Sequence, residues 1–472
     1  MTVTALVRRL RAGELSPVEA VGSALERIEA LDGRLNAFIS LRAEEALAEA
    51  ELAQRSSDRG PLWGVPLAVK DVIDVAGTPT TAGSRILADN RPAGDAEVVT
   101  RLRRAGAIVV GKLNTHEFAY GATTTSAHFG RACNPWALDR VCGGSSGGSG
   151  AAVAAGLVPA ALGTDTAGSI RIPAAFCGVT GVRPTTGLVP TRGMVPLSWS
   201  VDTVGPMARD ARDCALLLGV IAGPDPRDAS TEPVEPVDYV EQLASSRPRE
   251  LVVGIVESLF EGTIEPRIAA ASRLALDALR EAGVRTQSVE LPDLDQAVLV
   301  QQALQFPEAT AIHLGWLRTR LADYGADVRG RLLAGLFVPA TSYVTALRLR
   351  SAIAAGFAAA VEGVDCIAAP TLPTIAPRFA EGKVVFDSSG VASDALAENL
   401  FRQGLLRYTA PWSLVGWPVV SVPCGFVDGL PVGLSLVGRR FGETAALRAA
   451  AVFQALTDWH EQVPPEPEGD EG

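Results

Sequence analysis

The sequence predicts an α/β fold in which buried strands alternate with helices. Two short, continuous apolar runs at residues 65–70 and 107–110 are typical of buried strands, and the segment between them at 95–104 has a helical pattern. The segment SPVE at 16–19 is a capping box with proline at the first helical position, so a helix is expected from there to about Leu31. A glycine loop that continues into an alanine-rich run at 147–156 predicts a tightly packed helix.

The same criteria predict the remaining elements. Apolar runs at 419–423 and 432–437, joined through Asp428 and Gly429, have the alternation and the turn residues of a β-hairpin. The other expected elements are, in chain order, a helix at 42–54, strands at 159–163 and 251–256, a helix near 268–282, three further helical segments up to about 361, and a strand at 364–369.

The domain organisation is predicted from a change in composition. A proline-rich and acidic stretch at 222–236 separates a glycine-rich first half from a helix-rich second half. We interpret it as a surface connection within one domain over 1–462, with a core at about 60–215 and a helix-rich part at about 238–462. Residues 463–472 are acidic and rich in proline, which predicts a disordered tail.

Composition and charge argue against several classes of function. The formal net charge is −11 and no basic run is longer than the one at 101–104, so direct binding of nucleic acid is not expected. No apolar run approaches the roughly 20 residues of a membrane span, and the basic residues near the N-terminus follow an apolar stretch, unlike in a signal peptide. The six cysteines form no C-x-x-C pair, which predicts reduced thiols in a cytoplasmic protein without a metal site.

Two loops of small residues carry the most distinctive chemistry. They read GGSSGGSG at 143–150 and GTDTAGS at 163–169, and their candidate serines are Ser145 and Ser169. Such loops offer hydroxyl groups and exposed backbone amides, which suits acyl transfer, since one hydroxyl attacks a carbonyl while the amides hold the oxyanion. A base is still required.

A histidine is the first alternative for this base. The match to G-x-S-x-G at 144–148 would make Ser146 the nucleophile of an α/β-hydrolase, which also needs an acid and then a histidine downstream. Only His313 and His460 follow, both in helical patterns. The segment HEFAY at 116–120 lacks the second histidine of a zinc motif, and no phosphate-binding loop is present.

Lysine is the second alternative. Lys70 ends the apolar run at 65–70, and burial makes an ammonium group easier to deprotonate. A shift of its pKa from ~10.4 to near 7 needs about 4 to 5 kcal/mol, which a buried site can supply. Considered alone, a lysine at a strand end is more often solvated and structural, and the two loops are more often turns or helix caps than a site.

A family resemblance supports the catalytic interpretation. Motifs along most of the chain closely resemble those of the amidase signature family, in order and spacing. They are PLAVKD at 66–71, TTAGS at 80–84, GKLNTHEFAYG at 111–121, NPW at 134–136, GGSSGG at 143–148, GTDTAGSIRIPAAFCG at 163–178, RPTTG at 183–187, DTVGP at 202–206, APTLP at 369–373, TAP at 409–411 and DGLPVG at 428–433.

The resemblance implies an amidase signature fold, a large, mixed, mostly parallel β-sheet with helices on both faces. It also implies that Lys70 is the base, Ser145 the bridging serine and Ser169 the acyl-forming nucleophile, with no cofactor and no metal. The backbone amides of Thr166, Ala167, Gly168 and Ser169 match the oxyanion hole. Alanine replaces the usual glycine at 167, and because alanine resists positive φ we expect a change in local geometry rather than in activity.

Other residues receive supporting roles from the resemblance. Ser146, Asp165 and Arg171 are expected to hold the loops by hydrogen bonds. The segment with Phe118, Ala119 and Tyr120 is expected to line the acyl pocket, although core packing is an equally valid interpretation.

The first functional hypothesis is a stand-alone amidase that hydrolyses a small carboxamide. A glutaminase subunit of a tRNA-dependent amidotransferase is the alternative, and an inert scaffold is a third. In the amidotransferase subgroup an acidic residue shortly before T-x-P helps to hold the amino group of glutamine, whereas this chain has Leu406 and Arg407 there. A homodimer is compatible with the resemblance.

Overall fold

The fold is built around one large sheet. The structure is a computed structural model and describes residues 1–244, 247–380, 383–385 and 395–465. Its main sheet has 11 strands, and the predicted α/β class is confirmed. In spatial order the strands are β1 (Phe38–Leu41), β3 (Ile108–Leu113), β2 (Pro66–Lys70), β8 (Ala160–Asp165), β10 (Thr203–Ala208), β9 (Thr180–Arg183), β16 (Val419–Val427), β17 (Leu430–Gly438), β13 (Cys366–Pro370), β11 (Val252–Ile255) and β12 (Arg285–Ser288).

The sheet is mixed, as predicted, but parallel pairs are fewer than expected. β2 is parallel to β3 and β8, and β11 is parallel to β13 and β12. The six other neighbouring pairs are antiparallel and include the whole centre of the sheet from β8 to β13. One of these pairs is the hairpin β16–β17, which must be antiparallel because a short turn joins its two strands.

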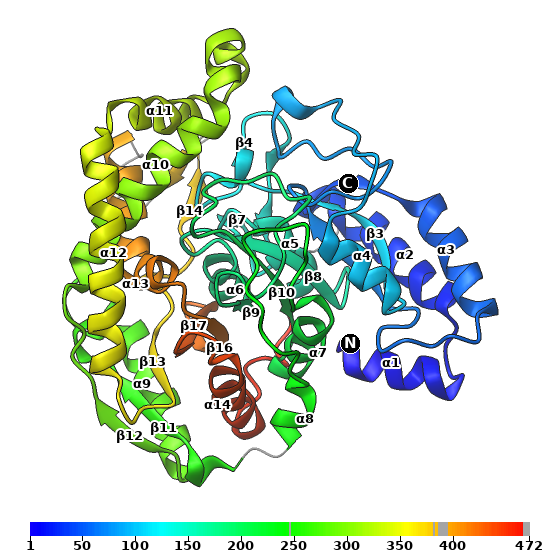
Figure 1. The fold of residues 1–472 in the computed structure, drawn as a ribbon. Coiled ribbons are helices and arrows are strands. Elements are labelled where there is room, and N and C mark those ends of the chain that lie inside the picture. The colour runs from blue at the N-terminus through cyan, green and yellow to red at the C-terminus, as the bar shows by residue number, and fades with distance from the viewer. Residues whose placement is uncertain (245–246, 381–382, 386–394, 466–472) are drawn as a thin grey trace.

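Helices cover the sheet on both sides. Figure 1 shows α1, α2 and α3 along one side of the molecule and α10, α11 and α12 along the opposite side. The helices are α1 (Val3–Ala12), α2 (Pro17–Leu35), α3 (Ala43–Arg55), α4 (Glu97–Arg104), α5 (Gly147–Ala154), α6 (Arg171–Cys177), α7 (Ala211–Ile221), α8 (Tyr239–Ala244), α9 (Pro266–Glu281), α10 (Leu294–Thr319), α11 (Ala326–Ala334), α12 (Ala340–Ala360), α13 (Ala395–Val415) and α14 (Glu443–Leu456).

Alternation along the strands divides the hydrophobic core between the two faces. Leu67 and Val69 of β2 lie in one core cluster, while Ala68 between them lies in another with Ile108 and Val110 of β3. Successive side chains of a strand point to opposite faces, so both faces of the sheet are buried. A continuous apolar strand sequence is the expected consequence.

Local sequence signals explain two of these elements well. The capping box of α2 is present, with the Glu19 amide donating to Ser16 Oγ at 3.2 Å and the Ser16 amide donating to Glu19 Oε2 at 2.7 Å. In the hairpin, Asp428 and Gly429 have φ values of 52° and 74°, as its two-residue turn requires. The helix α2 extends one turn beyond its predicted end, to Leu35.

The two halves of the chain share one core. The connection at 222–236 contains no helix or strand, and the Arg101 guanidinium binds its beginning by donating to the carbonyls of Ala222 and Gly223. Leu162 of the first half and Leu434 of the second belong to the same hydrophobic cluster, which supports the proposal of a single domain. Of the predicted tail, residues 466–472 lie outside the described residues.

Smaller features complete the fold. One small sheet contains β15 (Lys383–Val385), β14 (Arg378–Ala380), β7 (Ala137–Val141) and β6 (Cys133–Asn134), and another pairs β4 (Thr125–Ser126) with β5 (Gly130–Arg131). Within the described ranges, no single helix is long and apolar enough to cross a membrane; the helical pair 326–337 and 340–360 passes that test only jointly, with a bend of 94°. The same ranges contain no group of three residues suited to hold a metal ion, and all six cysteines are buried and unpaired.

Candidate active site

The ends of two strands and the start of one helix lie together at the candidate site. Lys70 is the last residue of β2, and β8, its parallel neighbour, leads directly into the loop that contains Ser169. Ser145 lies just before α5, in the other small-residue loop, and a cis peptide bond joins it to Gly144. The parallel pairing therefore brings residues that are far apart in sequence to one edge of the sheet.

Lys70 and Ser145 are in direct contact. Lys70 Nζ lies 2.7 Å from Ser145 Oγ and 2.7 Å from Thr164 Oγ1, and the lysine and both hydroxyl groups are buried. Burial lowers the pKa of Lys70 to about 7, although the carboxylates of Asp165 and Asp202 oppose the shift. A substantial fraction of neutral amine is therefore present at neutral pH, and at this distance it can accept a proton from Ser145.

A second buried lysine has different surroundings. Lys112 of β3 forms an ion pair with Asp71, with 2.9 Å between Nζ and Oδ1. Burial also lowers the pKa of Lys112, but here the adjacent carboxylate directly stabilises the ammonium form. Lys70 bonds two hydroxyl groups instead, so of these two lysines it is the one placed to act as a base.

The two serine loops are joined through their backbone and through Ser146. The Ser146 amide donates to the Ser169 carbonyl at 3.1 Å. Ser146 Oγ donates to the Thr164 carbonyl at 3.1 Å and accepts from the Thr164 amide at 3.2 Å. The hydroxyl of Ser146 therefore connects the first serine loop to β8. Ser169, in contrast, is 8% exposed and lines a small cavity.

In the second loop, at 163–169, some backbone amides are available to donate to an oxyanion and one is not. Thr166, Ala167 and Ser169 line the same cavity. Gly168 differs from the prediction, because its amide donates to Asp165 Oδ1 at 2.8 Å and its single N–H is thereby used. Ala167 has no positive φ, whereas Gly168 has φ 136°, so the alanine does not occupy the position that favours glycine.

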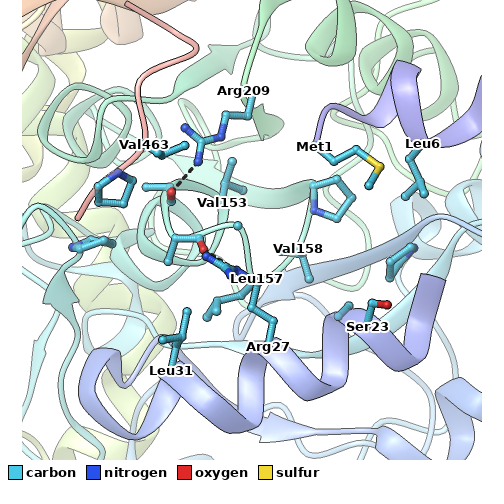
Figure 2. Close-up of a pocket in the computed structure, with 18 of the residues that line it drawn as sticks. Met1, Leu6, Ser23, Arg27, Leu31, Val153, Leu157, Val158, Arg209 and Val463 are labelled. Carbon is cyan, nitrogen blue, oxygen red and sulfur yellow. Dashed lines mark hydrogen bonds between the residues drawn. The ribbon is translucent and has the colours of Figure 1, made fainter. Parts of the chain in front are cut away.

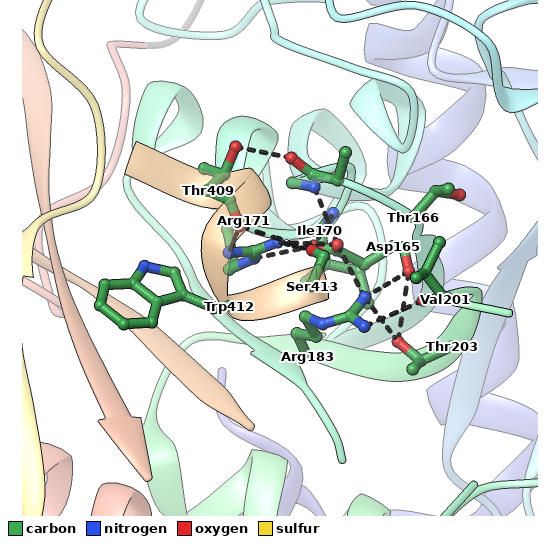
Figure 3. A network of polar contacts seen from close by, with 12 residues as sticks. Asp165, Thr166, Ile170, Arg171, Arg183, Val201, Thr203, Thr409, Trp412 and Ser413 are labelled. Carbon is green, nitrogen blue, oxygen red and sulfur yellow. Dashed lines mark hydrogen bonds and ion pairs between the residues drawn. The ribbon is translucent and has the colours of Figure 1, made fainter. Parts of the chain in front are cut away.

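A buried ion network holds this loop (Figure 3). The carboxylate of Asp165 accepts from Arg171 Nε at 3.0 Å, from Arg171 Nη2 at 2.9 Å and from Arg183 Nη1 at 3.1 Å, and all three side chains are fully buried. It also accepts from the amides of Gly168 and Ile170. Burial alone would raise the pKa of Asp165, but the two arginines outweigh this effect and hold the pKa well below its usual range.

Replacement of Asp165 by asparagine is expected to be strongly destabilising. Two buried guanidinium groups would lose their counter-ion, a loss that costs about 3 to 5 kcal/mol in comparable sites. Urea denaturation should show this decrease in the free energy of unfolding. The matched control is Asp295→Asn, because Asp295 is 76% exposed in its pair with Arg407 and should change stability by less than about 0.5 kcal/mol. Equal stability of the two variants would contradict the structural role of Asp165.

The cavity at Ser169 contains two of the three predicted pocket residues. Ala119 and Tyr120 line it, together with Leu405 and Leu406 of α13. Phe118 does not line it, in contrast to the pocket prediction. Its ring packs edge-to-face on His313, with 4.3 Å between centroids, in an aromatic cluster with Trp316 and Tyr324. Core packing, the other interpretation of Phe118, agrees with this position.

A larger cavity lies elsewhere in the molecule. It has a volume of about 540 Å³ and lies between α2 and the C-terminal end of α5 (Figure 2). Arg209 Nη2 donates to the Ala154 carbonyl at 2.6 Å and Arg27 Nε donates to the Ala155 carbonyl at 3.0 Å, which satisfies carbonyl groups at the end of that helix. None of the predicted site residues lines this cavity.

Comparisons with known proteins identify the family of this chain. The family model described as Amidase matches residues 19–447. The chain belongs to the amidase signature family. This amidase is 40% identical over 490 residues to the A subunit of the glutamyl-tRNA(Gln) amidotransferase from Roseiflexus sp. (strain RS-1), with 98% of each chain covered. It is 41% identical over 491 residues to the corresponding protein from Chloroflexus aurantiacus, again with 98% of each chain covered.

Superposition on solved structures identifies the same family. A structure described as a vestigial protein complex that reveals the evolutionary origins of an s-triazine catabolic enzyme superposes with a TM-score of 0.90 at 34% identity, over 96% of this chain and 98% of that one. A bacterial aryl acylamidase of the amidase signature family superposes with a TM-score of 0.87 at 26% identity, over 98% of both chains. This amidase is accordingly a hydrolase that acts on C–N bonds of amides.

Several residues that support the site have contacts that the sequence alone does not show. Arg183 joins the Asp165 network, and Asp202 accepts from Thr166 Oγ1 at 2.6 Å. Thr409 Oγ1 donates to the Ala167 carbonyl at 2.5 Å and packs where a Cβ on Gly168 would lie. These residues belong to the RPTTG, DTVGP and TAP motifs, so the family resemblance includes them, but the sequence does not show what they contact.

Proposed function

We propose that Lys70, Ser145 and Ser169 form a catalytic triad that hydrolyses an amide through an acyl-Ser169 intermediate. The contact of 2.7 Å between Lys70 Nζ and Ser145 Oγ, with the pKa of Lys70 lowered to about 7, carries this proposal. Neutral Lys70 takes the proton of Ser145 while Ser145 takes that of Ser169. The Oγ of Ser169 then attacks the amide carbonyl carbon and forms a tetrahedral oxyanion.

The second half of the reaction returns the protons. Ser145 protonates the leaving nitrogen, and the C–N bond breaks to leave an ester on Ser169 and free ammonia or amine. Water, deprotonated through the same serine and lysine, attacks the ester and releases the carboxylic acid. The backbone amides of Thr166, Ala167 and Ser169 are the proposed oxyanion donors, each contributing ~3 to 4 kcal/mol in the transition state.

Two substrates are compatible with this chemistry. The curated relatives favour glutamine, with the chain as the glutaminase subunit of a tRNA-dependent amidotransferase, because they match over 98% of both chains. They support this alternative better than a stand-alone amidase, which is the first hypothesis from the sequence. The apolar residues Leu405 and Leu406 in the cavity, by contrast, favour a small amide without an α-amino group.

One assay separates the candidates. Purified protein is tested for ammonia release from aliphatic, aryl and urea-type amides and from glutamine, with and without co-purified partner chains. Glutaminase activity that appears only with a partner identifies the amidotransferase component, whereas turnover of simple amides by the chain alone identifies the stand-alone amidase. Labelling of Ser169 by a fluorophosphonate rules out an inert scaffold, and the absence of both labelling and turnover would overturn the proposed function.

A further inference from the structure

We propose that Glu308 is a positioning residue for amide hydrolysis, because it holds the loop that fixes Thr166 at the oxyanion site. The inference rests on the proposed hydrolysis at Ser169 and on the proposed oxyanion role of the Thr166 amide. Glu308 lies on α10, outside the family motifs, and is 1% exposed. It acts through the 195–202 loop, a segment that contains no helix or strand.

Most hydrogen bonds of the Glu308 carboxylate go to this loop. Its Oε2 accepts from Ser198 Oγ at 2.5 Å, from Ser200 Oγ at 3.1 Å and from the Ser200 amide at 3.3 Å. Its Oε1 accepts from Tyr343 OH at 2.9 Å, in the first turn of α12. A buried carboxylate is costly without such donors, so the three bonds to Oε2 fix the loop against α10.

A second carboxylate, that of Asp202, connects the loop to Thr166. The amides of Leu197 and Ser198 both donate to Asp202 Oδ2 at 2.8 Å. Asp202 Oδ1 accepts from Thr166 Oγ1 at 2.6 Å. Ser198 therefore joins the two carboxylates, since its hydroxyl donates to Glu308 and its amide donates to Asp202. Hydrogen bonds to charged groups are stronger than those between neutral groups, so this path resists displacement.

The path ends at the wall of the active-site cavity. Leu197 and Thr166 both line that cavity. In the antiparallel pair β8–β10, Thr203 lies opposite Asp165, and beyond these strand ends the side chain of Asp202 holds Thr166. A misplacement of about 1 Å in a catalytic group can lower a rate by about 10²-fold. The rate should therefore depend on Glu308 although Glu308 does not line the cavity.

The first test compares two substitutions of Glu308. Glu308→Met keeps the chain length and removes both acceptors, whereas Glu308→Gln keeps an oxygen that can accept from Ser198. For the amide that the wild type hydrolyses best, Glu308→Met should lower kcat by about 10- to 100-fold and change KM by less than about 3-fold, because the oxyanion forms only during the reaction. Glu308→Gln should recover most of this loss. Fluorophosphonate labelling of Ser169 should slow in parallel, because its phosphoryl oxygen needs the same backbone donors.

Thr310→Val is the matched control on the same helix. Thr310 is 4% exposed, donates to the carbonyls of Phe306 at 2.9 Å and Leu332 at 2.6 Å, and does not line the cavity. Both Thr310→Val and Glu308→Met should be less stable in urea, but only Glu308→Met should lose kcat. Equal kcat in these two variants, or a loss in Glu308→Met that appears in KM alone, would contradict the proposal.

Ser198→Ala tests the same path without changing a charge. It removes the hydroxyl that donates to Glu308 and keeps the amide that donates to Asp202. We expect a decrease in kcat of about 3- to 10-fold, and little further decrease when Ser198→Ala is added to Glu308→Met, because the two groups act as a unit. Additive losses, or the kcat of Thr310→Val in Ser198→Ala, would contradict the path.

The pH profile gives a readout that a purely structural role would not change. The pKa of Asp202 is raised to about 6, mainly by burial and in part by the negative charge of Glu308. Lys70 on β2 and Arg183 on β9 are the cations that interact with Asp202. Protonated Asp202 has fewer acceptor sites for its donors, so kcat/KM should decrease more steeply below about pH 6 than above it. Glu308→Gln removes the charge and should move this change of slope to lower pH, whereas an unmoved slope change would contradict the proposal.

The outcomes keep this inference distinguishable from the proposed function. A wild type that shows neither turnover nor fluorophosphonate labelling would contradict the proposed function, and the role of Glu308 with it. Normal turnover and labelling of the wild type, with Glu308→Met equal to Thr310→Val in kcat and in labelling rate, would contradict only the role of Glu308.

Discussion

Ser169→Ala is expected to lower kcat for amide hydrolysis by a factor on the order of 10⁶. The variant loses the oxygen that forms the acyl ester, while Lys70, Ser145 and the loop amides stay in place. Residual hydrolysis would come from the oxyanion donors acting on bound substrate and water. The measurement is ammonia release under single-turnover and steady-state conditions, together with mass spectrometry for the acyl-enzyme.

Ser149 provides the matched control for this substitution. It is buried, lies on α5 and donates to the Leu162 carbonyl at 3.1 Å, but it does not line the cavity. Ser149→Ala should lose about 1 kcal/mol of stability and keep most of the activity. Formation of an acyl-enzyme by Ser169→Ala would show that Ser169 is not the nucleophile. Loss of the acyl-enzyme in a normally folded Ser146→Ala variant would contradict the assignment as well.

Lys70 is expected to control the pH dependence of catalysis. The base must be neutral, and the pKa of Lys70 is about 7, so kcat/KM should rise with pH, reach half its maximum near pH 7 and then level off. Lys70→Met should lose at least about 10³-fold in kcat and no longer show this rise. Lys70→Arg should be similarly inactive, because a guanidinium group keeps its proton. An unchanged pH profile in either variant would exclude lysine as the base.

The same pKa shift predicts a stability effect of known sign. The unfolded lysine keeps its proton up to about pH 10.5, whereas the folded one loses it near pH 7, so between these values the unfolded state binds more protons. The free energy of unfolding should therefore gain about 4 kcal/mol from pH 7 to 10.5 through this group. Lys70→Met lacks this contribution, which urea denaturation across the pH range can measure. An identical pH dependence in both proteins would contradict burial of the lysine.

Elements with strong local signals could be predicted from the sequence. The capping box before α2 and the Asp428-Gly429 turn depend on contacts within a few residues, so their chemistry is visible in short segments. Elements such as α6 and β10 were not predicted, because α6 contains Pro173 and β10 contains Gly205 and Pro206, residues that usually argue against a helix or a strand. Their geometry is stabilised by neighbours in the sheet and core.

Several properties of the site depend on contacts that no local pattern encodes. Phe118 lies within the motif at 111–121, yet its ring packs on His313 of α10, almost 200 positions later, instead of lining the cavity. Gly168 was expected to offer its amide to an oxyanion, but the fold turns that amide to Asp165. Leu406 lines the cavity from α13, more than 230 positions after Ser169, and no local pattern shows this.

By itself, the sequence determined the residue types, their order and the family motifs that single out Lys70, Ser145 and Ser169. The tertiary structure decided which groups meet: Lys70 with Ser145 across 75 positions, and Asp165 with two buried arginines. It also decided that Lys112 pairs with a carboxylate while Lys70 bonds hydroxyl groups. The reason is that proton affinity depends on burial and on neighbouring charges, and both arise only when distant segments pack together.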